Sequence, residues 1–163
     1  MLGDIRIKDR NGKTIHVGRF NSVKAAVEFA SLTKRGLTGA DLRWKQLIGL
    51  NLKGRRFTDV DFSGSNLEKT CFDSTVMARC ICDNAYFYKA DFRNAFLSDN
   101  SFIRANFEKA DFTIGFITRN DVTGADFSFA CFDTTWLSYQ SFRSAVIGKT
   151  DFSKAAFQSI TAR

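Results

Sequence analysis

The chain has few of the residues from which catalytic and metal-binding sites are built. Its 163 residues include one histidine, His16, and four cysteines. A catalytic site built on a histidine needs partners that converge on it, and a zinc site needs about four ligands at short, regular spacings. The pair Cys80 and Cys82 has no second pair to complete such a set, and the sequence holds no glycine-rich phosphate loop. We therefore expect no metal, no cofactor and no enzymatic activity.

Long apolar runs are missing as well. No stretch reaches the roughly 18 apolar residues of a transmembrane helix. The opening segment MLGDIRIKDR lacks the apolar centre of a secretory signal. The small number of cysteines fits a reducing compartment. These absences favour a cytoplasmic protein that does not contact a membrane.

Positive charge is concentrated in the first third of the chain. Residues 1–56 carry 13 Lys and Arg against 4 Asp and Glu, which is a net charge of +9. Residues 57–163 carry 11 against 13, which is a net charge of −2. The basic character therefore belongs to the N-terminal part, and the rest of the chain is close to neutral.

A five-residue period runs through most of the sequence. Every fifth residue from Leu37 to Phe157 is bulky and apolar, apart from the smaller Cys82. On an α-helix this series would spiral around the surface, because five residues advance by about 140°. On a flat strand it would alternate between the two faces. A chain that turns a corner every five residues instead directs all of these side chains to one axis. Four corners make a square coil of about 20 residues, and stacked coils lie about 4.8 Å apart.

The other positions of the period support this interpretation. The residue two places before each apolar centre is usually small, most often alanine, as a crowded inward corner requires. The residue just before the centre is often Asp or Asn, whose side chains stabilise turns. The period therefore predicts an all-β solenoid of about six coils. Because half of the larger residues at the small position lie near the start, we expect the first one or two coils to be distorted. These larger residues are Lys45, Leu50, Arg55, Val60, Asn100, Asn120, Gln140 and Ile160.

The repeat resembles the pentapeptide repeat family, whose pattern is Ala-(Asp/Asn)-Leu-X-X. Residues 40–42 read Ala-Asp-Leu, residues 90–92 and 110–112 read Ala-Asp-Phe, and residues 105–107 read Ala-Asn-Phe. The resemblance covers about residues 35–160. It implies a right-handed quadrilateral β-helix, a handedness that the spacing by itself does not give.

Residues 1–36 are predicted to cap the first coil. Two strands, at Asp4–Lys8 and Thr14–Gly18, flank the hairpin turn signal Asn11-Gly12. A helix begins after Asn21 or Ser22 and ends at a glycine. Gly36 is the C-terminal stop, and the apolar face of the helix consists of Val23, Ala26, Val27, Ala30 and Leu32. The chain thus divides into a hairpin–helix cap (1–36) and a repeat β-helix (37–163).

The C-terminal end shows no comparable cap. Two alternatives remain for covering its apolar core. Residues Gln158–Arg163 fold over the end, or two C-terminal ends meet in a symmetric homodimer.

Residues twenty apart should stack in columns. One inward column is a phenylalanine ladder: Phe72, Phe92, Phe112, Phe132 and Phe152. One outward column is aromatic where polar residues are expected, and we name it the aromatic strip: Val76, Phe96, Phe116 and Trp136, with Tyr139 beside the last. An exposed apolar strip is typical of an interaction site. The alternative is that these side chains fold over the corner and shield the core.

A second outward column, the lysine column, consists of Lys69, Lys89, Lys109 and Lys149, interrupted by Phe129. It is either a solvated charged face or, together with the basic N-terminal part, a track for a phosphate backbone. Tyr86 and Tyr88 beside it could stack on bases.

These features favour a non-catalytic protein-binding rod or scaffold that modulates a host or cellular enzyme by binding its surface. The hairpin–helix–solenoid layout resembles small phage and bacterial members of the family. The resemblance also implies DNA gyrase as a partner, because one branch of the family presents gyrase with an acidic rod like duplex DNA. Nucleic-acid binding through the basic N-terminal end is a further alternative, and a structural spacer is another.

Overall fold

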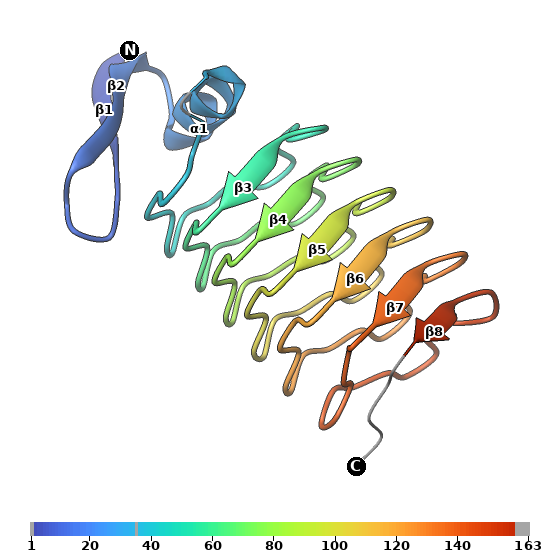
Figure 1. Cartoon of the computed structure of the whole chain (residues 1–163). Helices are drawn as coiled ribbons and strands as arrows, with labels where there is room; N and C mark the ends of the chain where they lie inside the picture. Colours follow the sequence, from blue (N-terminus) through green and yellow to red (C-terminus); the bar gives the residue numbers. More distant parts are fainter. Residues whose placement is uncertain (1, 35, 159–163) are drawn as a thin grey trace.

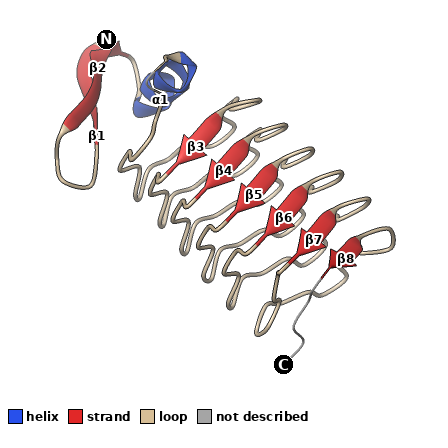
Figure 2. Ribbon diagram, viewed as in Figure 1, coloured by secondary structure: helices blue, strands red, loops and turns tan. Residues whose placement is uncertain are grey.

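The computed structural model describes residues 2–34 and 36–158 (Figures 1 and 2). A two-stranded antiparallel hairpin, β1 (Gly3–Lys8) and β2 (Thr14–Phe20), is followed by one helix, α1 (Val23–Leu32). The chain then winds as a β-solenoid with a six-stranded parallel sheet along one side. Its strands are β3 (Arg56–Thr58), β4 (Val76–Ala78), β5 (Phe96–Ser98), β6 (Phe116–Thr118), β7 (Trp136–Ser138) and β8 (Ala156–Gln158).

The hairpin turn forms where the sequence predicts it. Gly12 has a φ of +81°, which few residues other than glycine adopt readily. The Asp9 carboxylate accepts hydrogen bonds from the backbone N–H groups of Asn11 and Lys13, each at 2.9 Å. The turn therefore satisfies its own backbone.

The predicted helix is present, but two details were wrong. Ser22 caps it, since its hydroxyl accepts a hydrogen bond from the Ala25 N–H at 3.1 Å. Ala26, Val27 and Ala30 are buried, whereas Val23 and Leu32 at the two ends are exposed. The helix ends at Leu32 with Thr33 as its cap rather than at Gly36, because the Thr33 N–H and hydroxyl both bond back to the Ala30 carbonyl.

Hairpin and helix pair with the open backbone of the first coil. The Asp41 N–H donates to the Lys8 carbonyl at 2.7 Å, and Lys24 Nζ donates to the Ile48 carbonyl at 2.8 Å. The His16 ring nitrogen Nε2 lies 3.0 Å from the Gly36 carbonyl oxygen, so the only histidine ties the hairpin to the segment after the helix. These contacts cover the sheet edge that a solenoid end leaves unpaired.

The coils are square, as predicted. Parallel pairing joins residues twenty apart on all four sides, as in Asp41 with Asp61, Gln46 with Asn66, Asn51 with Cys71, and β3 with β4. The solenoid makes about five turns, so the prediction of about six is slightly high.

The first coil already keeps this register, and the predicted distortion of the whole coil is wrong. Leu50 and Val60 fit into the core. Lys45 turns outward and Arg55 is only partly buried. The Ser65 hydroxyl one coil below accepts the hydrogen bond from the Lys45 backbone N–H at 3.0 Å.

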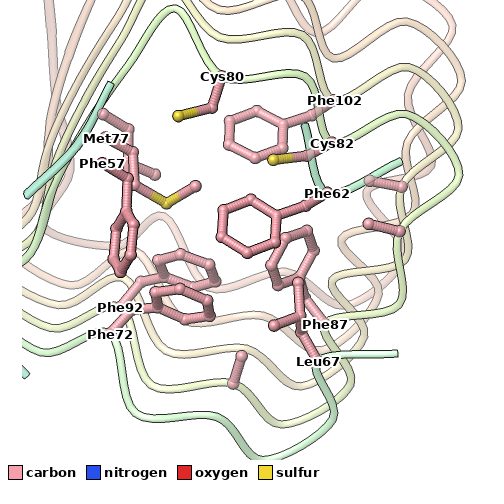
Figure 3. Packing of buried hydrophobic residues seen from close by; sticks show 14 of the residues in the cluster. Phe57, Phe62, Leu67, Phe72, Met77, Cys80, Cys82, Phe87, Phe92 and Phe102 are labelled. Atoms are coloured by element: carbon pink, nitrogen blue, oxygen red, sulfur yellow. The ribbon is translucent and has the colours of Figure 1, made fainter. Parts of the chain in front are cut away.

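Stacked rings fill the interior (Figure 3). In the phenylalanine ladder the centroids of Phe72 and Phe92 lie 4.7 Å apart with an interplanar angle of 2°, and the later pairs repeat this geometry. Near the C-terminal end the burial fades. Phe152 is only partly buried, and Ile147 and Phe157 are 49% and 51% exposed, against the expectation that every centre is hidden.

Nearly every corner has a left-handed residue two places after the apolar centre. Among the residues that the structure describes, eighteen residues other than glycine have positive φ angles, all at this position. The Asp or Asn before the centre accepts a hydrogen bond from the N–H two residues on, as Asp61 does from Ser63 at 3.0 Å. This is the predicted turn-stabilising role.

The large residues at the small position of one corner form a buried amide column: Asn100, Asn120 and Gln140. Most other corners close with a hydrogen bond from the small residue's N–H to the carbonyl three residues earlier. At this corner the side-chain amide of Asn120 takes the place of the bond between the Asn100 N–H and the Leu97 carbonyl in the preceding coil. Asn120 Oδ1 accepts a hydrogen bond from the Asn100 N–H at 3.0 Å, and Asn120 Nδ2 donates one to the Leu97 carbonyl at 3.0 Å. These three departures from the repeat pattern therefore serve to satisfy the backbone hydrogen bonds of this corner.

We predict that Asn120→Leu lowers the free energy of unfolding by about 1–3 kcal/mol or more, because it leaves the Asn100 N–H and the Leu97 carbonyl buried and unpaired at similar side-chain volume. Urea unfolding followed by circular dichroism measures this change. Gln46→Leu, which replaces an exposed amide side chain at a residue without positive φ, is the control for such a replacement outside the core. Equal stability of the Asn120 variant and the unchanged protein would contradict the assigned role.

Candidate interaction surfaces

The aromatic strip lies along the outer side of the six-stranded sheet. Val76, Phe96, Phe116 and Trp136 are the first residues of β4 to β7 and pair in register. The ring centroids of Phe96 and Phe116 are 5.1 Å apart at an interplanar angle of 2°, and those of Phe116 and Trp136 are 6.4 Å apart at 6°. The strand register therefore aligns the rings in one continuous stack.

The strip faces away from the core. The middle residue of each strand points inward, and Leu97 and Leu137 are buried. The rings of the strip stand on the opposite face of the same strands. Phe96, Phe116 and Trp136 remain 37–42% exposed.

Two further apolar residues flank the strip, and one of them was missed from the sequence. Tyr139, at the corner after β7, is 61% exposed, and Ile114, at the corner before β6, is 60% exposed. Both have positive φ angles, 49° and 60°. Bulky and β-branched residues are disfavoured in this conformation, so a large apolar residue at a left-handed corner was the signal that could have revealed Ile114.

Ion pairs follow the strands on one flank. Arg119, directly after β6, donates through Nε to Asp99 Oδ1 at 2.7 Å, and Arg79 pairs in the same way with Asp59 at 2.9 Å. The hydrogen bond from Arg119 lowers the pKa of Asp99 below its usual value. The strip thus has an apolar centre and a neutralised polar edge, which is the usual anatomy of a protein interface.

The lysine column is engaged in local contacts. Lys69 and Lys109 pair with the preceding glutamates, Glu68 and Glu108, at 2.8 and 2.9 Å. The Lys89 and Lys149 amines lie over aromatic rings, those of Tyr88 and Phe129, at 5.2 and 5.4 Å from the ring centroids. These contacts partly neutralise the column, as in a solvated charged face.

The buried thiols of Cys80 and Cys82 are poor nucleophiles. Burial raises the pKa of Cys80 to about 12 and that of Cys82 well above its usual value. A thiolate is the reactive form of cysteine. Within residues 2–34 and 36–158, no group of three His, Cys, Asp or Glu is placed to hold a metal ion. In the same part of the chain, no helix has the length and apolarity needed to cross a membrane.

Comparison with known proteins agrees with this architecture. The family model for pentapeptide repeats matches residues 37–73 and 80–113 in eight copies. No curated protein sequence matches the chain closely enough to count as a relative.

Several solved structures are similar to the chain at low identity. A pentapeptide repeat protein from the thylakoid lumen of Arabidopsis thaliana is 21% identical, with coverage of 75% of this chain and 71% of that one and a TM-score of 0.42. One from the cyanobacterium Cyanothece is 11% identical, with 74% and 86% coverage and a TM-score of 0.46. QnrB1, a plasmid-mediated fluoroquinolone resistance protein, is 19% identical, with 76% and 80% coverage and a TM-score of 0.37.

Proposed function

We propose that this chain, a pentapeptide repeat protein, is a non-catalytic rod that binds another protein through the aromatic strip and modulates it by covering its surface. The observation that carries the proposal is the unbroken stack of exposed rings from Phe96 to Trp136. Aromatic side chains contribute most of the energy of many interfaces, because they bury a large area with little loss of side-chain entropy.

The corners beside the strip supply a second argument. A left-handed corner is most stable with glycine or asparagine. Ile114 and Tyr139 occupy such corners, are mostly exposed, and therefore cost the fold stability. Partner binding explains why apolar side chains stand there.

The charge of the rod bears on the class of partner. Residues 57–163 carry a net charge of only −2, whereas a mimic of duplex DNA needs a strongly negative surface. The strip therefore fits an apolar patch on a partner protein better than a DNA-binding groove. Gyrase remains the alternative that the family resemblance implies, and a supercoiling assay with the purified protein tests it.

We also propose that the protein works in the cytoplasm. The support is chemical: the four cysteines of the chain are all free thiols, and two of them are deeply buried. Such thiols persist in a reducing compartment.

We predict that Phe116→Ser and Trp136→Ser each weaken partner capture. The assay is a pull-down from nuclease-treated bacterial lysate at low and high salt. The captured protein is then identified, purified and tested for binding to this protein in isolation. Each substitution breaks the ring stack and removes an exposed anchor, so affinity should fall by at least about tenfold, a typical hot-spot loss. The control is Phe129→Ser, which removes a 49% exposed ring from a different column.

A second variant separates binding from folding. Ile114→Asn places a residue suited to a left-handed corner, so the protein should become more stable while it binds the partner less tightly. If the strip variants keep full binding, or if Phe129→Ser weakens it equally, the strip is not the interface.

We propose that the exposed C-terminal end of the core joins two copies in a symmetric dimer. The inward residues Ile147 and Phe157 are each about half exposed there. The alternative cover, Gln158–Arg163, lies mostly outside the described residues. Burying such a surface against its copy is a common way to close an apolar end.

Light scattering at several concentrations is predicted to give twice the mass of one chain, and Phe157→Asp to give the mass of a single chain. Loss of the dimer with Trp136→Ser instead would place self-association on the aromatic strip. A single-chain mass for the unchanged protein at high concentration would rule out both dimers.

A further inference from the structure

A basic groove is lined by residues of the hairpin strand β1 and of the first coil, outside the aromatic strip. Figure 1 shows the hairpin and the first coil at the N-terminal end of the solenoid. The volume of the groove is about 450 Å³. We name it the hairpin groove, and its lining residues are Arg6, Lys8, Asp41, Arg43, Trp44 and Lys45. Arg6 and Lys8 face it together because alternate residues of a strand share a face.

Three of the four cations in the groove form no ion pair with a described residue, although the charge of Lys45 acts on the nearby Asp41 carboxylate. Arg43 makes two hydrogen bonds to Asp41, at 2.9 and 2.7 Å, and this contact lowers the pKa of the Asp41 carboxyl. Arg6, Lys8 and Lys45 form no ion pair with any other residue that the structure describes. Three unpaired positive charges around one concave surface repel one another and attract an anion.

The floor of the groove carries an aromatic platform. Trp44 is 72% exposed and has a φ of +59°. Its indole rests against Gly64, where any larger side chain would collide with the ring. A large aromatic residue at a left-handed corner costs stability, and Trp44 stays 72% exposed despite its contact with Gly64.

We propose that the hairpin groove binds a nucleotide unit of single-stranded nucleic acid or a free nucleotide, with the phosphate held by Arg6, Lys8 and Lys45 and the base stacked on Trp44. Arginine and lysine are the usual phosphate ligands, and a base stacks on an aromatic side chain through its planar face whatever its sequence. An acidic peptide would use the cations but would leave the flat, open face of Trp44 without a planar partner. This site is independent of the protein-binding strip.

The experiment follows the fluorescence of Trp44. Trp136→Phe leaves Trp44 as the only tryptophan of the chain. Titration with a single-stranded oligonucleotide of about eight nucleotides should quench this fluorescence. Affinity should fall as salt rises, with a slope in log K against log salt of about −0.7 for each phosphate contact. Adenosine monophosphate is titrated in parallel: if it binds as tightly as the oligonucleotide the ligand is a free nucleotide, and if only the oligonucleotide binds it is a strand.

Variants test the assigned residues. Lys8→Gln with Lys45→Gln should weaken binding at least about tenfold and flatten the salt slope. Trp44→Asn, which suits the left-handed corner and so preserves the fold, should weaken binding at least about fivefold, measured with a labelled oligonucleotide. The matched control is Lys89→Gln with Lys149→Gln, which removes two cations from the lysine column and should leave affinity unchanged.

Three outcomes would overturn the proposal. One is the absence of binding to either probe at low salt. Another is an equal loss of affinity in the lysine-column control, which would mean attraction by general positive charge. The third is tight binding of a poly-glutamate peptide, because recognition would then require only carboxylates.

Discussion

The twenty-residue register between successive coils is the constraint on which the rest of the structure depends. Each coil lies directly over the next, so its backbone groups pair with those of its neighbour and each inward side chain packs on an equivalent one, as Phe72 does on Phe92. A shift of one residue would move every buried centre to a corner. This register also means that every surface residue belongs to a column, and a functional surface can be built by repeating one type of residue.

The corners show where the fold and its surface have different requirements. Left-handed corners favour glycine and asparagine, and several corners follow that preference. Trp44, Ile114, Phe129 and Tyr139 are large apolar residues at such corners. The Phe129 ring lies under the Lys109 and Lys149 amines, whereas Trp44, Ile114 and Tyr139 are at least 60% exposed. Conformational cost without gain in packing is typical of positions kept for a function. The three residues lie on the two surfaces for which we propose partners.

The two surfaces differ in chemistry because the charge is divided between the ends of the rod. The hairpin groove gathers unpaired cations contributed by β1 and the first coil, whereas the aromatic strip is bordered by acid–base pairs that cancel. A rigid solenoid holds such sites at fixed separation. A protein of this shape can therefore present one surface to a protein and another to a phosphate-bearing ligand without either affecting the other.

The sequence by itself determined the solenoid, its four sides, the phenylalanine ladder and the composition of the aromatic strip, because a strict five-residue period allows one arrangement that buries its centres. It also located the hairpin turn at Asn11-Gly12 and narrowed the helix cap to Asn21 or Ser22, of which the structure has Ser22. Only the tertiary structure decided which side chains contact each other between coils and between segments that are distant in the sequence. The amide column needed the stacking of Asn100 on Asn120 to explain residues that break the repeat. The hairpin groove depends on the docking of β1 beside Trp44, a contact across about 40 residues that no local spacing encodes.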